Sequence, residues 1–449
     1  MITTKAALRD CATALFQTGI EAADPYKAVL RCLTASQDRL EILLDNTGQK
    51  RNGKWPKIHL IAFGKAACPM IEAALEVIPH DRLGRAIAVT NYENLTAIDG
   101  VTVLGASHPL PDEAGYNAAK QCAAIADNAK AGELVLVLVS GGGSALIPYP
   151  INSITLPEKV RTTDLLLASG ANINQINCVR KHLSQLKGGG LCRLIAPADC
   201  HALMLSDVIG DDLSTIASGP TVADETTFTQ AIEILKAKNI WDAVPQGVRR
   251  VLQQGQQGLI PETPKNNDAC FALACHTLIG SNRISVNAVV KTAQELGFAA
   301  ILYSDTLCGE AREAAEKLVL FAKEQAEKFD KKIAIIAGGE TTVTLKGNGR
   351  GGRNQEMALA FAMHAQKHGL KANWVFLSGG TDGRDGPTEA AGAIVDSGTI
   401  QRIMDANLNP ADLLADNDSN TALNASHDLL ITGATGTNVA DVQVLLIQN

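Results

Sequence analysis

The segment Leu134-Val135-Leu136-Val137-Leu138-Val139-Ser140-Gly141-Gly142-Gly143-Ser144 joins an unbroken apolar run to a glycine-rich loop. The apolar run predicts a strand that is buried on both faces, as in a parallel sheet. Three successive glycines then allow backbone N–H groups to converge on phosphate oxygens without obstruction by Cβ atoms. The spacing matches neither the P-loop nor the Gly-x-Gly-x-x-Gly dinucleotide motif. A tight turn is the structural alternative, but the position after a buried strand favours contact with a ligand.

The same order of elements recurs along the chain. Apolar runs at residues 58–63, 202–205, 333–337, 374–377 and 429–431 predict further buried strands, and residues 66–77, 111–129 and 310–329 have helical features. Strands that alternate with helices indicate mostly parallel, doubly wound sheets flanked by helices. In such α/β sheets, ligands bind at the carboxyl ends of the strands.

The length of 449 residues predicts two α/β domains. We expect them at residues 1–245 and 268–449. Residues 246–267 are polar, contain Pro261 and Pro264, and show no evident periodicity. We interpret this stretch as an exposed connection near the domain boundary.

Composition excludes several classes of partner. The net charge is −7, no basic block is present and aromatic residues make up 4% of the chain, which argues against binding to nucleic acid or to an anionic membrane. No window approaches the ~20 apolar residues of a membrane span, and the N-terminal residues do not have the pattern of a signal peptide. The ten cysteines include no Cys-x-x-Cys pair, so we expect reduced thiols. A cytoplasmic location is expected.

Charged residues stand in two other loops of the first half. Gly64-Lys65 closes the run at 58–63 and opens a helix, whose first N–H groups attract anions. Asp207 and Asp212 follow the run at 202–205 and carry carboxylates of the kind that bind Mg²⁺. A solvated lysine and helix-capping aspartates are the structural alternatives. The basic stretch 177–190 is interpreted as a capped helix end.

The second half repeats the pattern. Gly338-Gly339-Glu340 follows the run at 333–337, and Arg353 stands beside glycines at a helix start, where it suits bidentate capture of a carboxylate or phosphate. Asp382 can accept a proton from a substrate hydroxyl or bind a metal. A solvated arginine and an ordinary Asp-Gly turn are the structural alternatives. Together the loops suit phosphoryl transfer, where positioning and charge neutralisation do most of the catalysis.

These motifs, and the order in which they follow one another along the chain, resemble those of the class II glycerate kinases, the glycerate 2-kinases with a C-terminal MOFRL domain. The resemblance covers nearly the whole chain and places the MOFRL domain at about residues 331–443. It rests on Gly64-Lys65, on Ser107-His108-Pro109-Leu110-Pro111-Asp112, and on residues 140–146, 177–189, 207–221, 338–342, 349–356, 381–388 and 433–438.

The resemblance implies an ATP- and Mg²⁺-dependent transfer of the γ-phosphoryl group to the 2-hydroxyl of D-glycerate, in an active site in the cleft between two domains. It also implies that Lys65 and Arg353 are catalytic. We expect Lys65 to neutralise phosphate charge, Arg353 to hold the glycerate carboxylate or the phosphoryl group, and Asp382 to act as the base. ATP is expected at Ser140, Gly141, Gly142, Gly143, Ser144, Gly338, Gly339 and Glu340, and Mg²⁺ at Asp207 and Asp212. The residues leave open whether the chain is a monomer or a homodimer.

Two other functions compete with this interpretation. A hydroxypyruvate reductase would need a dinucleotide motif with an acidic residue about 20 positions further on. Gly347, Gly349 and Gly352 have the glycine spacing, but no acidic residue follows in the required region, residues 366–371. A non-catalytic sensor of sugar phosphates on an α/β scaffold is the second alternative.

Overall fold

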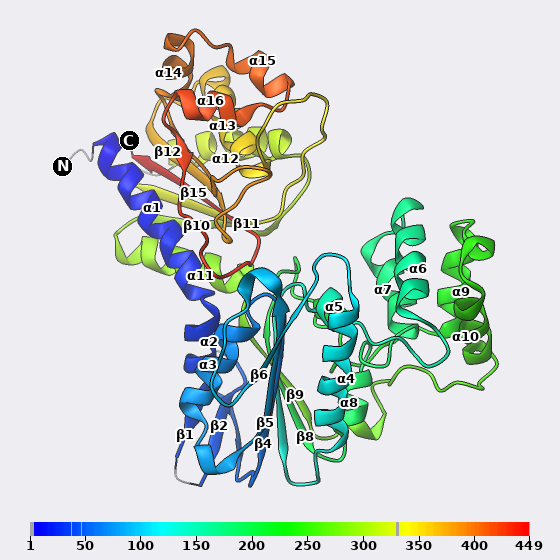
Figure 1. Ribbon diagram of the computed structural model, residues 1–449. Helices are drawn as coiled ribbons and strands as arrows, with labels where there is room; N and C mark the ends of the chain where they lie inside the picture. The colour runs from blue at the N-terminus through cyan, green and yellow to red at the C-terminus, as the bar shows by residue number, and fades with distance from the viewer. Residues whose placement is uncertain (1–3, 37, 46, 329–331, 449) are drawn as a thin grey trace. The chain divides into compact units, whose positions relative to one another are not determined.

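The computed structural model describes residues 4–36, 38–45, 47–328 and 332–448. The chain forms two compact units, which are drawn in Figure 1. Pro25–Ser206 and Asp211–Ile279 make up the parallel-sheet unit, and Met1–Asp24, Asp207–Gly210 and Gly280–Asn449 make up the mixed-sheet unit. This division differs from the limits expected from the sequence, because it groups residues 1–24 with the C-terminal half and residues 246–279 with the N-terminal half.

The parallel-sheet unit contains a six-stranded sheet with the order β6-β5-β4-β7-β8-β9. The strand pairs β6–β5, β5–β4, β4–β7 and β7–β8 are parallel. Counted from β4 as the first strand, this order reads 3-2-1-4-5-6, which is the doubly wound order of dinucleotide-binding folds. The order reverses between β4 and β7, and folds of this kind bind ligands at that point. The strands are β4 (Ile58–Phe63), β5 (Leu83–Asn91), β6 (Thr102–Ala106), β7 (Leu134–Val139), β8 (Asp199–Leu205) and β9 (Ala274–Gly280).

Helices cover both faces of this sheet. In Figure 1, α2 (Pro25–Cys32) and α3 (Ala67–Val77) lie on one side, and α4 (Glu113–Asp127) and α8 (Gly190–Ile195) lie on the other. Leu60, Leu136 and Leu138 are fully buried in the core that α2 and α3 share with the sheet. A small antiparallel sheet precedes the parallel one and consists of β1 (Leu33–Ala35), β2 (Leu40–Leu43) and β3 (Lys50–Gly53).

The predicted strands at 58–63 and 134–139 are confirmed to the residue, because both runs are apolar apart from the half-buried His59. The predicted helix at 111–129 is α4, which begins after Asp112. The carboxylate of Asp112 accepts a hydrogen bond from the N–H of Gly115 and so caps the helix.

Four helices of the parallel-sheet unit pack into a separate apolar cluster. One of them corrects the sequence analysis, since residues 246–256 form a helix and not an exposed connection. Val248, Val251, Leu252 and Gly255 recur at the spacing of one helix face and are buried, a periodicity that the surrounding glutamines obscured. Gly255 packs directly on the ring of Phe228. The helices are α6 (Leu156–Ala168), α7 (Ile173–His182), α9 (Phe228–Ala237) and α10 (Gln246–Gln256).

The mixed-sheet unit contains a second six-stranded sheet with the order β10-β11-β15-β12-β13-β14. The prediction of a mostly parallel sheet is wrong here, because only β10–β11 is a parallel pair and the other four pairs are antiparallel. The last strand, β15, inserts between β11 and β12 and runs antiparallel to both, and β12, β13 and β14 also follow one another in antiparallel pairs. The strands are β10 (Ala299–Leu307), β11 (Ile333–Gly339), β12 (Asn373–Gly380), β13 (Gly392–Asp396), β14 (Leu429–Leu430) and β15 (Asp441–Gln448).

Both faces of this mixed sheet are buried. Ile333 and Ile335 of β11 face a core shared with α12 (Ala311–Lys328) and α13 (Arg353–His368), whereas Ala334 and Ile336 face a core shared with α1 (Lys5–Ala22) and α11 (Asn282–Glu295). The alternation explains why the strands are apolar throughout. The predicted helix at 310–329 is α12. Residue 329, the predicted end of this helix, and residue 331, the expected start of the MOFRL domain, lie outside the described residues. Short helices complete the chain: α5 (Gly143–Leu146), α14 (Thr399–Asp405), α15 (Pro410–Ala415) and α16 (Ser419–Ala425).

Two expectations from composition can be compared with the structure. All ten cysteines are free thiols. In the part of the chain that the structure describes, no helix is both long and apolar enough to cross a membrane.

Candidate functional site

The loops after β4 and β7 are joined by backbone and side-chain hydrogen bonds at the reversal point of the parallel sheet. The N–H of Lys65 donates to the carbonyl of Gly141 at 2.9 Å, and the N–H of Ala66 donates to Oγ of Ser140 at 3.0 Å. Gly64 makes this approach possible, because its φ is +126° and a Cβ there would lie 2.1 Å from Oγ of Ser140. The sequence predicted two ligand loops at strand ends, and the structure brings them together.

The side chain of Lys65 is half-buried and forms no ion pair within the described part of the chain. It lies close to His108, and a Cβ added at Gly142 would contact both side chains. Burial and the charge of Lys65 both lower the pKa of His108, which keeps this imidazole neutral at neutral pH. Lys65 therefore has an unneutralised charge beside the glycine loop.

The glycine loop leaves donors unused. The N–H groups of Gly141 and Gly142 have no hydrogen-bond partner among the residues that the structure describes, and both glycines are only half-buried. Gly142 has a φ of +81° and stands at the start of α5. Successive N–H groups of this kind form a concave anion site, so the loop fits the phosphate groups of ATP.

Ser144, the last residue of the predicted loop, is surrounded by basic side chains that the sequence analysis missed. Nζ of Lys187 donates to the carbonyl and to Oγ of Ser144 at 2.9 and 2.6 Å, and Arg180 also donates to Ser144. Oγ of Ser218 lies 3.0 Å from Oγ of Ser144. Arg180 and Lys187 were interpreted as a capped helix end, because nothing in the sequence relates them to the loop 36 and 43 residues earlier.

The two predicted magnesium ligands differ in their surroundings. Asp207 is half-buried, whereas Asp212 is exposed and accepts hydrogen bonds from the N–H and Oγ of Ser214 and from Oγ1 of Thr215. Partial burial opposes these hydrogen bonds, but they prevail and lower the pKa of Asp212. The structural alternative of a turn-capping aspartate therefore describes Asp212 accurately. Its oriented carboxylate is also of the type that binds Mg²⁺.

Arg353 opens α13 in the mixed-sheet unit and is held by two carboxylates. Its Nε and Nη2 donate to the two oxygens of Asp441 at 2.6 and 2.9 Å, and its Nη1 lies 2.8 Å from Glu340. Asp441 is fully buried, which raises its pKa to about 6 although Arg353 opposes the shift. The side chain of Arg353 is 34% exposed, so an anion can reach it. Two donors of the Arg353 guanidinium are thus occupied by Asp441, and bidentate capture of a ligand by Arg353 stays a prediction.

The first N–H groups of α13 are already occupied. Asp385 accepts hydrogen bonds from the N–H groups of Asn354 and Gln355 at 3.0 and 2.8 Å. This carboxylate caps the helix and leaves those two groups unavailable to a phosphate. The sequence analysis gave Asp385 no role.

The other residues predicted in this unit have clear structural explanations. A Cβ at Gly338 would lie 2.0 Å from the Asn282 side chain, and one at Gly339 would lie 2.2 Å from the carbonyl of Leu307, so packing alone requires both glycines. Asp382 is half-buried and accepts a hydrogen bond from the N–H of Arg384 at 3.0 Å, as in an ordinary Asp-Gly turn.

The chain matches two family descriptions. Residues 11–253 match a domain of unknown function, DUF4147, and residues 333–441 match the MOFRL family. A glycerate 2-kinase from Pyrococcus horikoshii is 39% identical over 444 residues, which are 98% of this chain and 97% of the relative. These matches place the chain, with its two α/β units, among the phosphotransferases. The chain belongs to the glycerate 2-kinase family.

One solved structure and one relative with a different name are also similar to this chain. The crystal structure of a glycerate kinase from Thermotoga maritima has a TM-score of 0.87 and 37% identity to this chain, and the match covers 98% of this chain and 100% of the other. A relative from Agrobacterium vitis, 36% identical over 95% of both chains, has a name that contains the words hydroxypyruvate reductase.

Proposed function

We propose that this protein transfers the γ-phosphoryl group of ATP to the 2-hydroxyl of D-glycerate, which gives 2-phosphoglycerate and ADP. The observation that supports this most strongly is the junction of the loops after β4 and β7. There Lys65 stands next to two backbone N–H groups, and neither its ammonium group nor those N–H groups have a partner among the described residues. A lysine and a glycine loop at the reversal point of a doubly wound sheet suit the polyphosphate of a nucleotide.

In this proposal the parallel-sheet unit holds the nucleotide. Gly141 and Gly142 donate to phosphate oxygens, and Lys65 neutralises charge as the phosphoryl group moves. Bound Mg²⁺ would neutralise part of the phosphate charge. The carboxylates assigned to hold it are Asp212, which belongs to this unit, and Asp207, which belongs to the mixed-sheet unit. The N–H of Ser214 orients Asp212 for that purpose.

The mixed-sheet unit supplies the second set of residues. Nη1 of Arg353 contacts only the half-exposed Glu340, so the glycerate carboxylate or the transferring phosphoryl group can compete for it. Asp441 fixes the guanidinium plane from behind through the two remaining contacts. Asp382 is retained as the candidate base for the 2-hydroxyl.

The glycine spacing that the reductase alternative depends on, Gly347, Gly349 and Gly352, has a structural explanation. A Cβ at Gly347 would lie 2.2 Å from Asp416, and one at Gly349 would lie 2.3 Å from Asp418, so these glycines are needed for packing. Asp385 occupies the helix N-terminus where a dinucleotide pyrophosphate would bind. The sensor alternative predicts nucleotide binding without turnover.

The test is an assay of ADP release from ATP and Mg²⁺ with and without D-glycerate, run beside an assay of NADH oxidation with hydroxypyruvate. We expect ADP release that depends on glycerate and no oxidation of NADH. NADH oxidation without glycerate-dependent ADP release would establish the reductase, and nucleotide binding with neither reaction would favour the sensor.

A further inference from the structure

Three basic side chains of the parallel-sheet unit lie close together, and two of them contact Ser144. Lys159 comes from α6, Arg180 from α7 and Lys187 from the turn after α7. Lys187 and Arg180 donate hydrogen bonds to Ser144. Burial lowers the pKa of Lys159 to about 7, with the charge of Arg180 as the second cause, and burial together with both neighbouring charges lowers the pKa of Lys187. The three charges are therefore close enough to repel one another.

This cluster has no counter-charge. Among the residues that the structure describes, none of the three cations forms an ion pair with Asp or Glu, and Nζ of Lys159 has no hydrogen-bond partner although its side chain is buried. Lys159 is 5% exposed and Lys187 is 2% exposed. Buried charges without partners cost free energy, and proteins ordinarily pair them.

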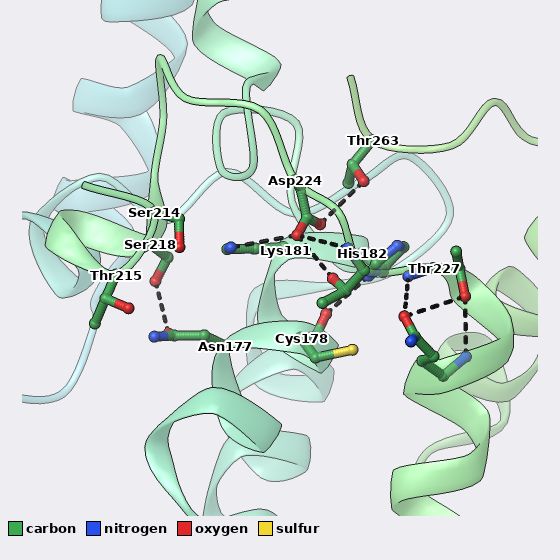
Figure 2. Close-up of polar contacts among 12 residues, drawn as sticks. Asn177, Cys178, Lys181, His182, Ser214, Thr215, Ser218, Asp224, Thr227 and Thr263 are labelled. Atoms are coloured by element: carbon green, nitrogen blue, oxygen red, sulfur yellow. Dashed lines mark hydrogen bonds and ion pairs between the residues drawn. The ribbon is translucent and has the colours of Figure 1, made fainter. Parts of the chain in front are cut away.

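The neighbouring lysine shows that this part of the fold can neutralise a buried ammonium group. Nζ of Lys181 lies 3.3 Å from the carboxylate of Asp224, as Figure 2 shows. Figure 2 also shows Ser218, whose Oγ donates to Oδ1 of Asn177 at 3.0 Å. The same Oγ lies 3.0 Å from Oγ of Ser144. Lys181 thus has a carboxylate partner, whereas Lys159 has none among the described residues. An anion from outside the chain would take the place of that carboxylate.

We propose that Lys159, Arg180 and Lys187 form a binding site for a doubly charged phosphoryl group at the Ser144 end of the glycine loop. A guanidinium and two ammonium groups around one serine suit a dianion better than a single carboxylate. Ser144 and Arg180 are half-buried, so a ligand reaches them from solvent, while the two lysines lie behind. The site rests on the proposed kinase function, which offers two sources of the phosphoryl group: the polyphosphate of ATP and the phosphate of 2-phosphoglycerate.

The experiment is calorimetric titration of the full chain and its Lys159→Met variant with ATP, with 2-phosphoglycerate and with inorganic phosphate. Methionine keeps the length of the side chain and removes its charge. We expect Kd to rise about tenfold or more for at least one phosphoryl ligand, since a buried charged partner is lost. A rise for ATP alone assigns the site to the nucleotide, a rise for 2-phosphoglycerate alone assigns it to the product, and a rise for both assigns it to the group that is transferred. Unchanged affinity for all three ligands would overturn the proposal.

Two control variants separate this site from general effects of charge and packing. Lys130→Met removes an exposed lysine of the same unit and should leave every Kd unchanged. Lys181→Met should lower the Tm, because Asp224 loses its cation, whereas Lys159→Met should leave the Tm of the protein without ligand equal or raise it.

The unmodified protein provides a further test that does not depend on the folding of a variant. At pH 8 Lys159 is largely neutral, and a bound dianion would favour its charged form, so binding should take up a proton. Titrations in two buffers with different ionisation enthalpies measure this uptake, and its absence would contradict the site. ADP release with glycerate is measured on the same sample. An inactive wild-type protein would refute the kinase function, whereas an active one with unaltered Lys159→Met binding would refute only this site.

Discussion

Lys65 and Arg353 carry the same charge in opposite surroundings. No carboxylate of the described chain pairs with Lys65, whereas Arg353 is bound to both Asp441 and Glu340. A cation without a partner is available to develop new contacts with a transition state, and a cation held by two carboxylates is fixed in direction. The two residues should therefore respond differently to substitution.

Lys65→Ala should reduce kcat by roughly 100-fold to 1,000-fold, the loss typical of one preorganised electrostatic group. The free energy of unfolding should change by no more than about 0.5 kcal/mol, because no ion pair or side-chain hydrogen bond is removed. Steady-state kinetics and urea unfolding measure the two effects, and Lys130→Ala serves as the control at an exposed lysine. Near-normal kcat in Lys65→Ala would remove this residue from the mechanism.

Asp441 should make stability depend on pH in a defined direction. Burial raises its pKa from 3.8 to about 6, with Arg353 opposing the shift. The folded protein then holds a proton that the unfolded chain has lost, so the stability contributed by the protonated carboxyl is complete below about pH 4 and is lost as the pH rises through about 6.

The measurement is the free energy of unfolding of wild type minus that of Asp441→Asn, followed from pH 4 to pH 8. The difference should fall up to about pH 6.5 and stay level above pH 7. A difference that rises with pH would mean that the ion pair with Arg353 outweighs desolvation.

At the scale of elements, the proposed nucleotide site depends on the close contact between the loop that follows β4 and the loop that follows β7. Gly64→Ala would place a Cβ 2.1 Å from Oγ of Ser140, whereas a Cβ at Gly132, which also has a positive φ, meets nothing within 4 Å. Both variants suffer the same kind of backbone strain, so their difference isolates the steric clash. Gly64→Ala should lose roughly 1–3 kcal/mol more stability than Gly132→Ala in urea unfolding. Equal losses would show that the loops do not require this close contact.

Elements were predicted well from the sequence where one pattern dominated. The runs at 58–63 and 134–139 gave exact strand limits because both faces of the strands are buried. The helix α10 was missed because glutamines surround its apolar face. The antiparallel insertion of β15 could not be foreseen, since strand direction depends on which neighbours pair and not on the local pattern.

The candidate site was only partly predictable for a related reason. Lys65 and the Ser140–Ser144 loop stand at strand ends, where position itself indicates a ligand. Lys159, Arg180 and Lys187 come from two helices and a turn, and each charge on its own resembles a solvated one. Only the fold reveals that they lie together, that both lysines are buried, and that no carboxylate of the described residues pairs with them.

At the scale of the whole molecule, the proposed chemistry assigns the nucleotide to one compact unit and the second set of residues to the other. The comparisons cover both units, since the DUF4147 match ends at residue 253 and the MOFRL match begins at residue 333. The family matches therefore span both halves of the chain, and the proposed chemistry draws residues from each half.

The most direct test of that account is to identify the product with enolase, which consumes 2-phosphoglycerate but not the 3-isomer. D-glycerate, ATP, Mg²⁺ and this protein are incubated with enolase, and formation of phosphoenolpyruvate is followed without added mutase. We predict that phosphoenolpyruvate forms at the rate of ADP release. Release of ADP with phosphoenolpyruvate only after mutase is added would contradict phosphorylation at the 2-hydroxyl, and no release of ADP would contradict the kinase function itself.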